Sequence, residues 1–315
     1  MTSDDNPATA DPHASAYDGL LGGDEGHWAF GTTLLDLQSD DPLAGVDTTV
    51  AEGIDHVALA AYCLMLGDDA LIMSQQLSKW TAKAPDLEED VALSNTALDL
   101  LGQARLLLAR AATADPDVVP AMPVGSPVPD EDALAFFRDQ SEFRNVGLVE
   151  PDNGDFASTL VRLFVFTVWR LAIFQRLAGS QDRVLAAVAA KGVKEMTSHR
   201  DYAARWVVTL AQGTEESHRR TVEALARWWP QLDELFVTHP FEKSMSDAGV
   251  GVDPSTLTTE VRAVLTTVLA AAQLQQPDVP QIAGPGGRAG THSESMGALL
   301  TEMQAVARAH PMGSW

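Results

Sequence analysis

From Thr49 onward, apolar residues recur at intervals of three and four positions over long segments, and the alternation that strands need is not sustained anywhere. This spacing gathers apolar side chains on one face of an α-helix, so the sequence predicts an all-α fold. Glycine, proline and acidic residues punctuate the pattern, as at Pro85 and at Gly213-Thr214. The expected helices cover residues 50–81, 86–112, 131–149, 154–179, 181–211, 214–237, 255–275 and 293–309.

A proline-rich stretch separates the first two helices from the rest. Its prolines are Pro116, Pro120, Pro123, Pro127 and Pro129. Because proline lacks the amide hydrogen of a helix ladder, this stretch predicts a long extended crossover. Two helical hairpins joined by one long crossover are the connectivity of ferritin-like four-helix bundles. We therefore expect a single ferritin-like domain over residues 48–315, with the bundle at about 50–237 and a C-terminal appendage with additional helices at about 238–315.

The charge of the chain excludes several classes of partner. Residues 1–47 are rich in small and acidic residues and predict a disordered acidic tail. The whole chain has 21 Lys and Arg against 44 Asp and Glu, a net charge of −23, which disfavours nucleic acids and anionic membrane surfaces. We expect no signal peptide, because no basic segment followed by an apolar block opens the chain. With one cysteine, Cys63, no internal disulfide can form, and we expect a soluble cytoplasmic protein.

One segment has the opposite charge. Residues 156–206 carry eight basic residues against three acidic ones. An acidic partner or an anionic ligand would find its most favourable patch there, although a basic helix face is more often only solvated. Three arginines also interrupt the most apolar stretch, residues 160–177, which argues against a membrane span.

Ferritin-like bundles can hold two iron ions, with a Glu on each of two helices and a Glu-x-x-His on each of the other two. The corresponding positions here offer Asp68, Asp99, and Glu195 with His199. The imidazole that would follow Asp99 is replaced by Gly102, and the helix at 154–179 offers Thr167 where a carboxylate would be needed. These positions resemble a degenerate ligand set, so we predict no catalytic, cofactor-binding or metal-binding residue in this chain.

The same residues have a second interpretation as buried polar pairs. Asp99 with Gln103, and Glu195 with His199, would then be tied to each other or to nearby basic residues, because an unpaired buried charge costs several kcal/mol. Those basic residues are Arg105, Lys194 and Arg200. A further Glu-x-x-His, Glu215 with His218, directly follows Gly213-Thr214, and helix capping explains it better than metal binding.

Several sequence blocks occur together in one order. The segment 92–105 reads ALSNTALDLLGQAR. The other blocks are 66–71 with 76–80, 143–145 with 151–157, 194–199, 213–217, 290–294 and 302–304. In this order, from about residue 54 to the C-terminus, they resemble the C subunits of bacterial phenylacetyl-CoA epoxidases.

The resemblance implies a ferritin-like fold and a non-catalytic structural subunit of a monooxygenase complex in aerobic phenylacetate catabolism. It implies a related catalytic A subunit that carries the di-iron centre and binds the acyl-CoA, a small B subunit, and a reductase with FAD and an iron–sulfur cluster. No cofactor is expected in this chain, and an indirect contact with acyl-CoA is left open. Two alternatives stay open as well: a catalytic di-iron oxygenase with an atypical ligand set, and a helical adaptor protein.

Overall fold

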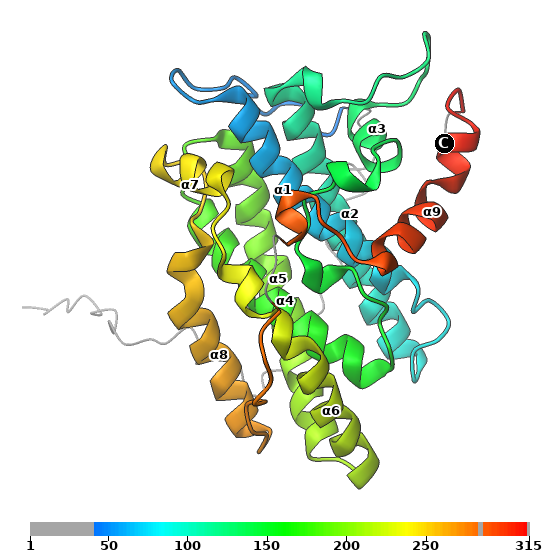
Figure 1. The fold of residues 1–315 in the computed structure, drawn as a ribbon, viewed down its shortest axis with the longest axis vertical. Helices are drawn as coiled ribbons and strands as arrows, with labels where there is room; N and C mark the ends of the chain where they lie inside the picture. Colours follow the sequence, from blue (N-terminus) through cyan, green and yellow to red (C-terminus); the bar gives the residue numbers. More distant parts are fainter. Residues whose placement is uncertain (1–40, 283–285, 314–315) are drawn as a thin grey trace, which may run out of the picture.

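The computed structural model describes residues 41–282 and 286–313, which form helices, short 3₁₀ turns and loops without a strand (Figure 1). The helices are α1 (His56–Ser78), α2 (Leu87–Ala114), α3 (Asp130–Phe136), α4 (Phe156–Leu177), α5 (Arg183–Ala211), α6 (Glu215–Trp228), α7 (Pro240–Asp247), α8 (Thr258–Ala271) and α9 (Glu294–Ala309). The all-α prediction is confirmed. Residues 1–40, which make up most of the predicted acidic tail, lie outside the described residues.

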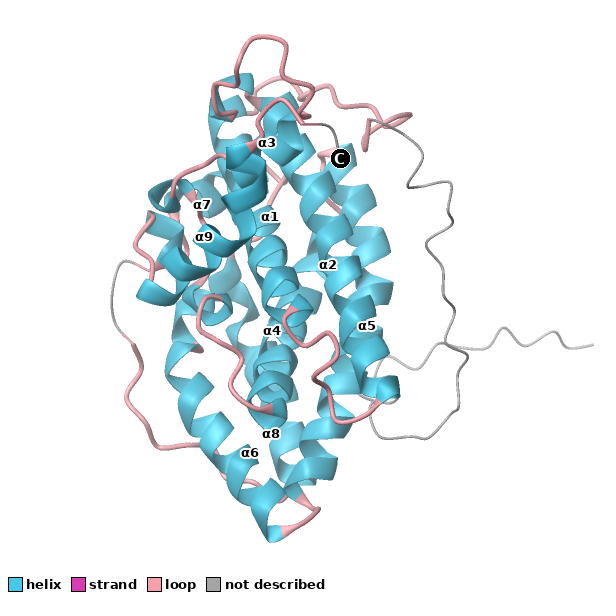
Figure 2. Cartoon of the chain, turned by 90° about the vertical axis from the view of Figure 1, so that its right-hand side faces the viewer, coloured by secondary structure: helices cyan, strands magenta, loops and turns pink. Residues whose placement is uncertain are grey.

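Two helical hairpins form the bundle. α1 packs along α2, α4 packs along α5, and α2 also contacts α5, so the hairpins close on each other (Figures 1 and 2). Between α2 and α3 the chain runs from Asp115 to Pro129 with only a 3₁₀ turn at Pro116–Val118. This is the extended crossover that the prolines predict, and it produces the ferritin-like connectivity.

Aspartates define where the bundle helices begin. The side chain of Asp55 accepts a hydrogen bond from the amide of Ala58, and this places the start of α1 at His56 rather than at residue 50. The N-caps of α2, α4 and α5 act in the same way: they are Asp86, Asp155 and Asp182. An aspartate thus satisfies the N-terminus of each of the four bundle helices.

The helix expected at 131–149 is wrong over its second half. α3 ends at Phe136, and the chain then makes 3₁₀ turns at Gln140–Glu142 and Gly147–Val149. The physical reason is a competition for backbone N–H groups. The amides of Arg144 and Val146 donate to the buried carboxylates of Asp68 and Asp69 at 2.8 Å, so they are not available to a helix ladder.

The C-terminal half differs from the expectation at α6 and at α7. α6 ends at Trp228, because Pro230 follows, and two 3₁₀ turns continue to Phe236. The short helix α7 was not expected, whereas α8 and α9 lie within the predicted ranges 255–275 and 293–309. α8 packs on α4 and α5, and α9 packs on α3, so the appendage covers two separate sides of the bundle.

α4 forms the centre of the core, packed against α5, α6 and α8. Its residues 157–174 are buried without interruption, which explains why its sequence is apolar on all sides. α1 and α4 are each long and apolar enough to cross a membrane by length and composition, but 89% and 94% of their apolar windows are buried inside the fold. Both are therefore core helices of this bundle.

Replacing Gly192 with alanine should destabilise the bundle. A Cβ atom at this position of α5 would overlap the ring of Phe174 on α4. We expect Gly192→Ala to lower the free energy of unfolding by about 1–3 kcal/mol. The matched control is Gly102→Ala on α2, where a Cβ would meet nothing within 4 Å and should stabilise the helix by about 0.5–1 kcal/mol. Urea unfolding measures both, and equal shifts in the two variants would contradict the close approach of α4 and α5.

Candidate functional site

The polar residues predicted on the second and fifth helices do meet, but crosswise. Nε2 of His199 lies 2.9 Å from Oδ2 of Asp99, and Nδ1 of His199 lies 3.1 Å from the hydroxyl of Thr96. The amide of Gln103 donates to Oε2 of Glu195 at 2.8 Å. The four side chains therefore bond to one another, but each pair joins α2 to α5 rather than lying within one helix, and of the four only Gln103 is buried.

Arg170 of α4, rather than Arg105, Lys194 or Arg200, connects this network to α1 and α4. Its Nε donates to Oε1 of Gln103 at 2.9 Å, and its Nη1 donates to the carbonyl of Leu66 on α1 at 3.2 Å. The side chain is fully buried, and its guanidinium lies 4.6 Å from the centre of the Phe174 ring. Burial lowers the pKa of Arg170 to about 10, and the nearby charge of Asp69 opposes this shift. A cation thus lies between α1, α2 and α4.

Asp68 lies outside this group. Its carboxylate accepts a fork of hydrogen bonds from the Arg138 guanidinium and a further bond from the amide of Arg144. Arg138 is itself buried and stacks on Phe143, 4.2 Å from its ring centre. Asp68 therefore anchors the segment that follows α3, and the neighbouring Asp69 is the acid that α1 presents toward Arg170.

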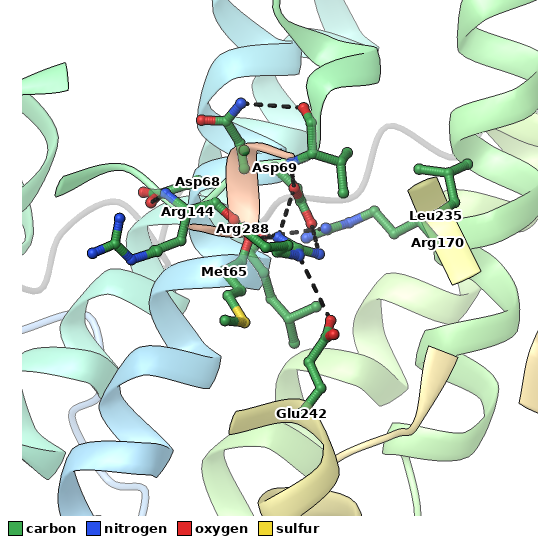
Figure 3. Close-up of polar contacts among 12 residues, drawn as sticks. Met65, Asp68, Asp69, Arg144, Arg170, Leu235, Glu242 and Arg288 are labelled. Atoms are coloured by element: carbon green, nitrogen blue, oxygen red, sulfur yellow. Dashed lines mark hydrogen bonds and ion pairs between the residues drawn. The ribbon is translucent and has the colours of Figure 1, made fainter. Parts of the chain in front are cut away.

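Arg288 is the main partner of Asp69 (Figure 3). Its Nη1 and Nη2 donate to the two carboxylate oxygens of Asp69 at 3.0 and 2.8 Å, and Nη1 also donates to the carbonyls of Met65 and Arg144. Its Nε lies 3.6 Å from Oε1 of Glu242 on α7. One guanidinium thus connects α1, the α3–α4 connection, α7 and the C-terminal segment.

The carboxyl groups around Arg288 have raised pKa values because they are buried. Burial raises the pKa of Asp69 and of Glu242, and in both cases the charge of Arg288 opposes the shift. The Arg288 pKa is raised, since its own burial is outweighed by the attraction of Asp69, Glu242 and Glu234. The geometry favours an ion pair at Asp69, because both carboxylate oxygens receive charged N–H donors at ordinary hydrogen-bond distances.

The two positions where the sequence lacks a metal ligand, Gly102 and Thr167, take no part in the polar contacts described above. Gly102 is exposed on the outer side of α2, and a side chain there would start in open space. Thr167 is fully buried, and its hydroxyl donates to the carbonyl of Leu163 one turn earlier in α4 at 2.7 Å. Thr167 thus satisfies its polar group within its own helix.

The residues present do not fit a carboxylate-bridged di-iron centre. Such a centre needs several carboxylates and imidazoles converging on two cations. Here Asp69 is held by Arg288, Asp99 is bound to His199, and the guanidinium of Arg170 stands between α1, α2 and α4. Within the part of the chain that the structure describes, no group of three His, Cys, Asp or Glu side chains could hold a metal ion.

Only part of the basic stretch at 156–206 reaches the surface. Arg162, Arg170 and Arg200 are buried, because α4 is a core helix and α5 turns one face inward. Arg176 is partly exposed but binds Glu260 of α8 through two hydrogen bonds. The arginines of α4 thus balance buried polar groups or a neighbouring helix. The other exposed basic residues of the stretch all lie on α5, and an anionic partner at this place stays a prediction; they are Arg183, Lys191, Lys194 and Arg205.

The second Glu-x-x-His motif lies at the start of α6. Thr214 caps the helix by accepting from the amide of Ser217, and Glu215 occupies the first turn. Nδ1 of His218 lies 2.8 Å from the carbonyl of Ala211, the last residue of α5. These contacts agree with the capping interpretation.

Sequence reasoning missed the arginines that bind the α1 acids, Arg138 and Arg288. Two adjacent acids in the apolar helix α1 were a signal that buried cations exist. Their partners lie 70 and 219 positions along the chain, and nothing in the local pattern distinguishes them from solvated arginines. His292 was missed for the same reason: its Nδ1 lies 2.7 Å from Oε1 of Glu150, and both side chains are buried.

Fold and interior together define a ferritin-like helical bundle in which arginine side chains balance the buried carboxylates. The chain belongs to the PaaA/PaaC family of phenylacetic acid catabolic proteins, whose model matches residues 46–315. It is 39% identical over 257 residues to the C subunit of 1,2-phenylacetyl-CoA epoxidase from Escherichia coli strain K12, a match that covers 82% of this chain and 99% of that relative. The family resemblance in the sequence blocks is thereby confirmed.

Removing the Arg288 guanidinium should destabilise the protein strongly. In Arg288→Met, Asp69 and Glu242 lose their buried cation, so we expect the free energy of unfolding to fall by about 3–5 kcal/mol. The control is Arg176→Met, which removes a half-exposed pair with Glu260 and should cost about 1 kcal/mol or less. Urea unfolding of both variants tests this, and similar losses would show that the Arg288 contacts add little.

Glu195→Gln should change the pH dependence of stability. Burial raises the pKa of Glu195, so the folded carboxyl holds its proton more tightly than the unfolded one. Its contribution to stability is therefore present at low pH and is lost as the pH rises through the folded pKa. Gln can still accept from Gln103, so we expect Glu195→Gln to be more stable than the unmodified chain at pH 8, by a margin that shrinks toward pH 5. The exposed Glu302→Gln serves as control, and a margin independent of pH would contradict the burial effect.

Proposed function

We propose that this chain is the C subunit of a 1,2-phenylacetyl-CoA epoxidase and acts as its non-catalytic structural subunit. The identity to the Escherichia coli protein over nearly its whole length supports the assignment as a C subunit. The position of Arg170 supports the non-catalytic role most directly, because a buried guanidinium at the centre of the bundle opposes the binding of metal cations there. The expected partner is the related A subunit, which would carry the di-iron centre and bind the acyl-CoA.

In this proposal the chain contributes a rigid surface and no reacting group. Salt bridges from Asp68, Asp69 and Asp182 to buried arginines fix the positions of the bundle helices and the connecting segments. The small B subunit and a reductase with FAD and an iron–sulfur cluster would complete a cytoplasmic complex. The alternative of a catalytic site with an atypical ligand set draws on the meeting of Asp99, Glu195 and His199 beside one another, and Arg170 argues against it.

Reconstitution tests the proposal. The purified chain, the A subunit from the same source, and both together are assayed for epoxidation of phenylacetyl-CoA with the B subunit and the reductase. We expect activity only when both chains are present, with iron in the A subunit and less than about 0.2 iron per chain of this protein. About two irons per chain here would establish the atypical catalytic site instead. Full activity of the A subunit alone would contradict the structural role.

A further inference from the structure

The outer face of α2 carries large apolar side chains in contact with solvent. Leu87, Val91, Leu98 and Leu101 have exposed fractions of 72%, 41%, 63% and 45%. With Ser94 between them, they follow one another at intervals of four, three, four and three residues. A solvated helix face is normally polar, whereas this spacing is that of a seam between two aligned helices. We call these five positions the α2 seam; it spans about 21 Å at 1.5 Å per residue.

A depression borders each side of the α2 seam. On the α5 side lies a groove of about 690 Å³, whose walls include Leu87, Val91, Tyr202 and Trp206. On the α1 side lies a smaller hollow of about 190 Å³, lined by small side chains of both helices and by Leu98 and Leu101. α2 and α5 run side by side along one flank of the bundle (Figure 2). Helices pack by placing the side-chain ridges of one helix into the grooves of the other. The apolar side chains of the α2 seam form such a ridge, and the depressions on its two sides form such grooves.

The charge of α2 decides between possible occupants. From its N-cap to Ala104 the helix contains no Lys or Arg and five acids: Asp86, Glu88, Glu89, Asp90 and Asp99. Two copies of this chain joined at their seams would bring these acids toward each other, in addition to a net charge of −23 on each copy. A different chain that carries Lys or Arg beside its own apolar stripe meets no such repulsion.

We propose that the α2 seam is the docking site for a helix of the catalytic A subunit, which inserts apolar side chains into the α2–α5 groove and places basic residues beside the first turn of α2. This inference rests on the proposed function, since it names the surface through which the two subunits pair. Glu89 already accepts hydrogen bonds from Tyr202 and Trp206, and Asp90 accepts one from the amide of Ala82, so Glu88 is the acid of the first turn that we assign to the partner.

Glutamate substitutions in the seam test the docking site. Leu98→Glu and Leu101→Glu should preserve the fold, because both side chains are exposed, and should weaken binding to the A subunit about 30-fold or more, as expected for central interface residues. The matched controls are Val222→Glu on α6 and Val306→Glu on α9, with exposed fractions of 44% and 58%. Affinity is measured by calorimetry with purified subunits, and urea unfolding confirms that each variant is folded.

The outcomes separate this inference from the proposed function. Seam variants that bind the A subunit as tightly as the controls overturn the docking site and leave the proposed function intact. No binding by the unmodified chain overturns both. A homodimer of the unmodified chain that Leu98→Glu dissociates would identify a second copy as the occupant and overturn the choice of partner.

Glu88→Lys tests the charge of the partner. We expect this variant to bind the A subunit more weakly and its affinity to depend less on salt concentration. An unchanged affinity and an unchanged salt dependence would contradict basic residues on the partner beside the first turn of α2.

Discussion

Two adjacent carboxylates in the middle of α1, Asp68 and Asp69, constrain much of the structure. Both are completely buried, so each needs charged or N–H donors from other segments. Arg138 and the amide of Arg144 serve Asp68, while Arg288 and the amide of Val146 serve Asp69. These contacts require the chain to leave the helical conformation after α3 and to return to the bundle at residue 288. The 3₁₀ turns and the C-terminal segment are therefore consequences of two acids on one helix.

The interior shows how a ferritin-like bundle balances charge with arginine. Carboxylates facing each other in a bundle repel unless a cation lies between them. In this chain a guanidinium supplies that cation, since Arg170 extends from α4 toward α1 and α2 and Arg288 enters from outside the bundle. A guanidinium also directs five N–H groups in a fixed plane, so it sets the spacing between helices as well as their charge. The cost is an Nη2 of Arg170 that has no hydrogen-bond partner among the described residues.

The sequence was sufficient for most features that depend on neighbouring residues, although it missed the end of α6 before Pro230 and the short helix α7. Helix positions followed from apolar spacing, and the crossover followed from its prolines, because both properties act within a few residues. The meeting of α2 with α5 could also be predicted, since Asp99, Gln103, Glu195 and His199 lie one turn apart on their helices. Whether an arginine side chain points into the bundle or to the surface could not be predicted. Arg170 and Arg176 both lie on α4, yet one is buried in the bundle and the other binds α8 at the surface.

Equal numbers of buried carboxylates and arginines leave the net negative charge of the chain on its outer surface. Among the described residues, the buried ionisable side chains other than histidine, tyrosine and cysteine are six carboxylates and six arginines. Burial therefore removes no net charge, and the −23 of the chain stays with its remaining, mostly solvated groups. The repulsion between such surfaces opposes association of two copies of the chain. An apolar seam on α2 would otherwise promote self-association, but acids surround it, so the charge that opposes pairing between copies favours a partner of opposite sign at the seam.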